Sequence, residues 1–131
     1  MRAKTMKALI LLLAASTAFG ATTTRSPLSK ISPANKKLYA EVRDAKDWRN
    51  PYLVVGASDV QVLHVGNTTA EQLKTFLEKL PKKAWPYGRV VALSEQGIRS
   101  GNVDKLIKEN LEKVLAALKA EKIKVELWPS A

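Results

Sequence analysis

The chain has 131 residues, the size of one domain, and it contains no cysteine. Disulfide bonds and thiolate metal sites are therefore excluded, so a hydrophobic core alone must stabilise the fold. Basic residues outnumber acidic ones by 22 to 12, for a formal net charge of +10. This excess favours attraction to polyanions, although the bases alternate with acids along the chain, as they do on an ordinary solvated surface.

The N-terminus has the three zones of an export signal. It begins with a few basic residues, residues 8–15 form an unbroken apolar run, and small residues precede an expected cut before Ala21. A membrane-spanning helix needs about 20 apolar residues, which is more than this run supplies. We therefore expect residues 1–20 to be a cleaved signal peptide and the mature chain to be periplasmic or secreted. A retained N-terminal anchor is the alternative.

Residues 21–32 are small, polar and interrupted by proline, a composition typical of a flexible leader. The domain is then expected over residues 33–131. Pro33, preceded by a serine cap, marks a helix start, and the pattern predicts a polar amphipathic helix over residues 33–47. Asn50 ends it, because a residue before proline avoids the α region.

Two β-type runs follow, over residues 52–57 and 60–65, and the short polar link between them predicts a hairpin. Thr68 and Glu71 have the spacing of a capping box, in which each side chain satisfies a backbone N–H group of the other. Apolar residues then recur at helical spacing over residues 70–80, so we expect a helix that Pro81 ends.

The second half of the chain repeats this alternation of strand and helix. Residues 82–88 are a loop, 89–93 a short buried strand, 94–101 a polar loop, 102–121 an amphipathic helix, and 123–127 a half-buried edge strand. The order ββαβαβ predicts one small α/β (α+β) domain. Its mixed sheet would be packed by two amphipathic helices, with the additional N-terminal helix beside them.

This organisation resembles the periplasmic halves of biopolymer transport proteins of the ExbD/TolR type. The resemblance covers residues 52–127 and depends on the hairpin followed by a capped helix (residues 67–73) and on the last strand after a long helix. It implies an extracytoplasmic setting, self-association through the sheet edge and a role as an anchored accessory subunit of a transport complex. The family's anchor carries an aspartate, whereas residues 8–20 contain no ionisable side chain. No functional residue therefore carries over.

No catalytic set is evident in the sequence. His64 is the single histidine, no nucleophile motif accompanies it, and neither cysteine nor a second histidine can complete a metal site. We expect a structural histidine, no metal, no cofactor and no enzymatic activity. Acid–base chemistry by carboxylates stays open, because it depends on separations in space.

Two segments are candidates for binding. The loop of residues 94–102 precedes a helix N-terminus, where amides bind anions, and its candidate ligands are Arg99, Ser100 and Asn102. It would serve an anion- or sugar-binding domain, or a small enzyme. The other segment joins bases to aromatic rings, which are enriched at binding surfaces. This expected interaction surface comprises Lys82, Lys83, Trp85, Tyr87, Arg89 and Trp128. The alternative is that Trp85 and Trp128 close the ends of the core.

The sequence thus favours an exported, non-enzymatic interaction module of the bacterial cell envelope. Its expected partner is an envelope protein or an anionic envelope polymer, and the chain could also form a homodimer. Membrane contact would be transient and confined to the signal peptide. We expect no nucleic acid as a partner, because the strands lack the regular aromatic platform of an RNA-binding sheet.

Overall fold

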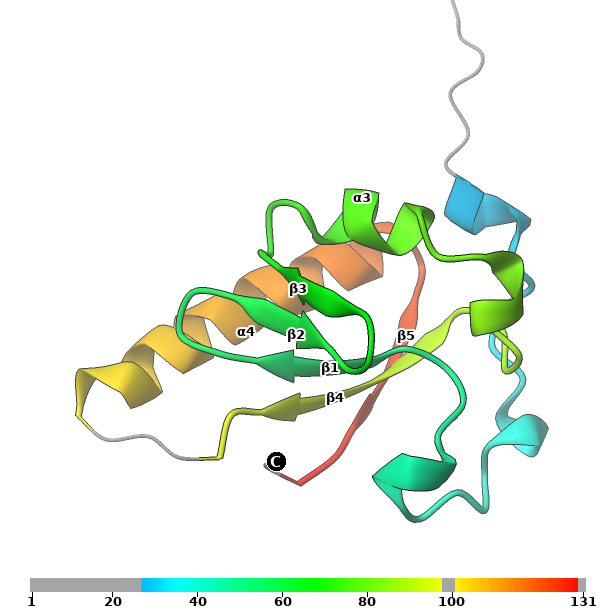
Figure 1. Ribbon diagram of the computed structural model, residues 1–131, viewed down its shortest axis with the longest axis horizontal. Helices are drawn as coiled ribbons and strands as arrows, with labels where there is room; N and C mark the ends of the chain where they lie inside the picture. The colour runs from blue at the N-terminus through cyan, green and yellow to red at the C-terminus, as the bar shows by residue number, and fades with distance from the viewer. Residues whose placement is uncertain (1–26, 98–100, 130–131) are drawn as a thin grey trace, which may run out of the picture.

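A five-stranded mixed sheet is the centre of the computed structural model, which describes residues 27–97 and 101–129 (Figure 1). The strands lie in the order β3-β2-β1-β4-β5. Their bounds are β1 Tyr52–Val55, β2 Val60–Val62, β3 Gly66–Thr68, β4 Val90–Glu95 and β5 Lys124–Leu127. Helices α3 (Leu73–Glu78) and α4 (Asn102–Ala120) connect them. The expected class, a small α/β domain with two packed helices, is confirmed, with the element order βββαβαβ.

The topology explains why both helices cover the same face of the sheet. Strand β1 pairs with β4 in parallel, and β4 pairs with β5 in parallel. The crossover through α3 leads from β3 past β2 and β1 to β4, and the crossover through α4 leads from β4 to β5, so both move in the same direction across the sheet. Right-handed crossovers in one direction place their helices on one face. Leu73 and Leu77 of α3 and Val114 and Leu118 of α4 accordingly belong to one buried cluster.

Side-chain alternation in the central strands divides the core in two. Leu53 of β1 and Val91 and Leu93 of β4 face the helices. Their neighbours in the sequence, Tyr52 and Ala92, belong to a second cluster on the opposite face. Because successive side chains of a strand point to opposite faces, strands buried on both sides read as continuous apolar runs.

Residues 27–50 form a segment that we call the strap, and its later part, which includes Tyr39 and Trp48, covers the second face. The strap carries three 3₁₀ turns: η3 (Pro27–Lys30), η4 (Lys36–Leu38) and η5 (Ala45–Asp47). In Figure 1 the strap descends in blue and cyan beside the end of the sheet where β4 begins. The helix expected over residues 33–47 is therefore wrong.

Two Asx turns, formed by an asparagine and an aspartate, explain why the strap is not helical. The side chains of Asn35 and Asp44 accept hydrogen bonds from the backbone N–H groups of Lys37 and Lys46, at 3.1 and 3.2 Å. Such bonds offer the backbone an alternative to helical pairing. The non-helical path of the strap lets it bury both Tyr39 and Trp48 against the sheet. One helix would bury only a narrow stripe of side chains.

The boundary expected at residue 33 is placed too late. Leu28 and Ile31 are buried in the core on the helical face, so residues 27–32 belong to the domain. The remainder of the expected leader, together with the expected signal peptide, lies outside the described residues. Within the described part of the chain, no helix is long and apolar enough to span a membrane.

The region after β2 also differs from the expectation. A turn centred on His64, which adopts a positive φ of 65°, ends β2 early and starts the third strand, β3. Thr68 is therefore in a strand. The capping box it was expected to form with Glu71 is wrong, because Thr69 instead accepts a hydrogen bond from the Gln72 N–H at 3.2 Å.

Candidate functional site

A groove between the strap and the loop of residues 82–88 lies beside the expected interaction surface. Its volume is about 320 Å³. The strap forms one wall and the loop the other, and the loop begins with a 3₁₀ turn, η6 (Lys82–Ala84). The groove is lined by Ile31, Ser32, Pro33, Asn35, Leu38, Lys82, Trp85, Pro86, Tyr87 and Gly88.

Backbone hydrogen bonds join the two walls at the floor of the groove. The Arg89 N–H donates to the Ser32 carbonyl oxygen, and the Asn35 N–H donates to the Tyr87 carbonyl oxygen, both at 2.9 Å. Pro33 forms a parallel β-bridge with Arg89. This short pairing extends the sheet beyond the start of β4 and fixes the strap against the loop.

Gly88 makes this close approach feasible. Its φ is +87°, a conformation that L-residues rarely adopt. A methyl group at this position would overlap the Pro33 carbonyl oxygen and would lie 2.8 Å from the Ser32 carbonyl oxygen. The groove floor therefore requires glycine at this position.

The Asn50 side chain holds the loop wall in place by hydrogen bonds. This buried side chain donates to the carbonyl oxygens of Gly88 and Val90, at 2.7 and 2.8 Å. Its amide oxygen accepts the Tyr87 N–H at 2.8 Å. One side chain thus satisfies three backbone groups of the segment that forms the wall, which makes Asn50 a positioning residue for the groove.

An aromatic cluster supports the groove from the side of the sheet. The Tyr87 ring lies 5.0 Å from the Trp48 ring and 5.5 Å from the Tyr39 ring, measured between centroids. Trp128 extends the cluster by edge contacts with Trp48 and Tyr52. Burial, with a smaller contribution from Glu126, raises the pKa of Tyr39. The hydroxyl oxygen of Tyr39 is buried and has no hydrogen-bond partner among the described residues.

The surroundings of the groove are basic. Lys82 lines it, and three exposed lysines adjoin lining residues in the sequence: Lys36 and Lys37, between Asn35 and Leu38, and Lys83, next to Lys82. In the part of the chain that the structure describes, none of them is paired with a carboxylate. Leu38, on the strap wall, exposes 54% of its surface. The groove therefore combines positive charge with an apolar contact.

The residues of the expected interaction surface are divided between surface and core. Lys82 and Lys83 are exposed, but Trp85 and Tyr87 are only 4% and 7% exposed. Trp85 enters the core on the helical face, and Tyr87 enters the aromatic cluster on the other. The two rings therefore hold the loop to the domain and present little surface to a partner.

Arg89 and Trp128, the remaining members, are half-buried. The Arg89 Nε is buried without a partner among the described residues. Trp128 packs against the aromatic cluster, away from Trp85. Sequence reasoning thus found the loop wall of the groove but missed the strap wall. The signals for that wall were Asn35 and the exposed Leu38, which the expected helix obscured.

The second candidate, the loop of residues 94–102, lies only partly within the described residues. Arg99 and Ser100 lie outside the described residues, and Asn102 is an exposed residue at the start of α4. Glu95, at the end of β4, forms an ion pair with Lys108 at 3.0 Å, which connects the strand to the helix across this loop. These contacts are structural and identify no ligand.

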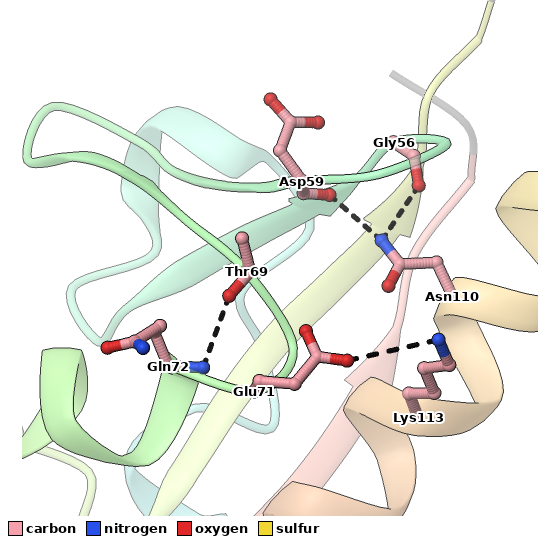
Figure 2. A network of polar contacts seen from close by, with 7 residues as sticks. All are labelled: Gly56, Asp59, Thr69, Glu71, Gln72, Asn110 and Lys113. Atoms are coloured by element: carbon pink, nitrogen blue, oxygen red, sulfur yellow. Dashed lines mark hydrogen bonds and ion pairs between the residues drawn. The ribbon is translucent and has the colours of Figure 1, made fainter.

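A polar network on α4 connects the helix to the hairpin (Figure 2). The buried Asn110 side chain donates to the carbonyl oxygens of Gly56 and Asp59, at 2.9 and 3.1 Å. Nearby, Lys113 lies 3.9 Å from the Glu71 carboxylate. Because the Asn110 amide is already bound to both ends of the β1–β2 turn, we interpret the network as structural.

His64 offers no catalytic geometry. It is exposed in the turn between β2 and β3, and not within a strand as expected. Over residues 27–97 and 101–129, no group of three or more histidine or carboxylate side chains could hold a metal ion. Comparison with protein-family models, with characterised proteins and with solved structures finds no significant match to this chain.

Proposed function

We propose that this chain is a non-enzymatic binding module of the bacterial cell envelope and that it binds its partner in the groove between the strap and the 82–88 loop. The observation that carries the proposal is the groove itself. It combines a preformed backbone, an exposed leucine and Lys82, with three more exposed lysines next to its lining residues in the sequence. Preformed hollows with an apolar contact and a few polar groups are the usual form of binding sites.

Rigidity supports this assignment. The floor is fixed by the hydrogen bonds to Ser32 and Asn35, and the loop wall is fixed by Asn50. A binding surface that is ordered before the partner arrives loses little conformational entropy on binding. The envelope setting rests on the export signal expected in residues 1–20, and a role as an anchored subunit is the alternative that this signal leaves open.

Site-specific photo-crosslinking in the native host tests the proposal. A crosslinking side chain replaces Leu38 in the groove, or Leu106 on α4 as the matched control, because these leucines are similarly exposed, at 54% and 46%. We expect one discrete crosslinked product from position 38 in the envelope fraction and none from position 106. Equal products from both positions, or no product from position 38, would contradict the proposal.

Export is measured in the same cells. A mature chain that begins near Ala21 and fractionates outside the cytoplasm is the expected product. A full-length precursor in the cytosol would contradict the envelope part of the proposal, even if the groove bound a partner.

A further inference from the structure

We infer that the occupant of the groove is an extended acidic segment of a partner polypeptide, with apolar side chains between its carboxylates. This inference rests on the proposed function, because it identifies the partner of that same groove. The observations that select this chemistry are the lysines in and next to the lining of the hollow and the apolar residues of that lining.

Lysines occur in both segments that form the walls. Lys82 lines the groove on the loop side, where Lys83 follows it, and on the strap side Lys36 and Lys37 come between the lining residues Asn35 and Leu38 in the sequence. Lysine supplies a compact point charge on a flexible stem. Charges distributed over both segments match negative groups spaced along a chain, whereas a single phosphate is bound by donors that converge on one point.

None of the described residues that line the groove is acidic. An acidic segment would therefore meet no like charge inside it. The acidic residues of the strap come later in the chain, and one of them, Asp44, already lies 3.9 Å from Lys46. Complementary charge of this kind speeds association and excludes partners of the wrong sign.

The lining of the groove also includes apolar side chains. Leu38, Pro33 and Pro86 are exposed in it. An apolar side chain of a peptide can contact these residues while its neighbouring carboxylates reach the lysines. Polyphosphate has no apolar group to place there, and a flat anionic lipid surface would not enter a hollow between two walls. The polypeptide is therefore the occupant that uses both features.

Fluorescence anisotropy with a labelled probe peptide tests the inference on the purified mature chain. The probe is a short peptide rich in glutamate with interspersed leucines. We expect saturable binding that weakens as salt is added, because exposed charges are screened. A second probe carries glutamine in place of every glutamate, and we expect its affinity to be at least tenfold lower.

Charge reversal locates the binding. Lys82→Glu combined with Lys83→Glu should weaken binding of the acidic probe about tenfold, since each reversal removes a favourable exposed pair and adds a repulsive one. Leu38→Ser should weaken it severalfold. The matched control, Lys105→Glu with Lys119→Glu, has the same net charge but alters exposed lysines of α4, and it should bind nearly as the unchanged chain does.

The possible results separate this inference from the proposed function. Equal weakening by the groove pair and the α4 pair would overturn the inference, since binding would then follow net charge alone. Groove-dependent binding of polyphosphate or phosphatidylglycerol vesicles that is tighter than peptide binding would also overturn it, but would leave the groove as a binding site. Failure of the crosslinking experiment would instead overturn the proposed function.

Discussion

Asn50→Ala removes the side chain that fixes the loop wall of the groove. The variant loses the donors to the carbonyl oxygens of Gly88 and Val90 and the acceptor for the Tyr87 N–H. Because Asn50 is only 6% exposed, water cannot readily replace these bonds. We therefore expect the variant to lose both overall stability and the shape of the groove.

The magnitude follows from the bonds that are lost. A buried backbone group left without a partner costs about 1–3 kcal/mol. The Gly88 carbonyl also accepts the Val90 N–H at 2.8 Å, so its loss contributes least. The three losses together amount to about 3–5 kcal/mol, a large part of the roughly 5–15 kcal/mol that stabilises a typical domain.

Equilibrium urea unfolding, followed by tryptophan fluorescence and circular dichroism, measures this loss. Unfolding free energies of small domains change by about 1–3 kcal/mol per molar urea, so we expect the midpoint to fall by about 2 M. The matched control is Asn67→Ala, because Asn67 is exposed in β3, and it should change stability by less than about 0.5 kcal/mol.

Asn50→Asp distinguishes the hydrogen bonds from simple packing. Aspartate keeps the acceptor for Tyr87 but turns an ionised oxygen toward two carbonyl oxygens, so we expect it to be at least as destabilising as alanine at neutral pH. Protonation at acidic pH restores one donor, and its stability should then recover in part. A loss of less than about 1 kcal/mol for Asn50→Ala, with no pH dependence for Asn50→Asp, would refute the reasoning.

Three further predictions concern single positions. Gly88→Ala should destabilise the domain clearly more than Gly101→Ala, because both glycines have positive φ but only Gly88 meets backbone atoms; thermal unfolding compares the two variants. Tyr39, whose pKa is raised in the folded state, contributes stability that is complete below about pH 10 and is lost as the pH rises through the folded-state pKa. Tyr39→Phe should reduce that alkaline loss in urea titrations, and an unchanged pH profile would count against it. Asn110→Ala should cost about 2–4 kcal/mol and speed amide exchange in the β1–β2 turn; unchanged exchange there would contradict the role assigned to Asn110.

The sequence alone determined most of the elements that are regular over several residues. The long helix after Gly101 has seven apolar positions at helical spacing, and the strands near residues 52, 60, 90 and 124 are β-rich runs bounded by turn residues. These are local signals, because the period of the pattern and the residues that break it are readable within one segment. The loop wall of the groove was likewise found from its lysines and aromatic residues.

Only the tertiary structure decided how the second face of the sheet is covered. Two right-handed crossovers in one direction leave that face without a helix, and the strap, held out of helical conformation by Asn35 and Asp44, covers it with aromatic rings. The same packing buries Trp85 and Tyr87 and places Leu38 opposite the loop. These outcomes depend on contacts between segments that lie roughly 40 to 60 residues apart. No local pattern encodes such contacts, because the free energy that selects them comes from burial in the assembled domain.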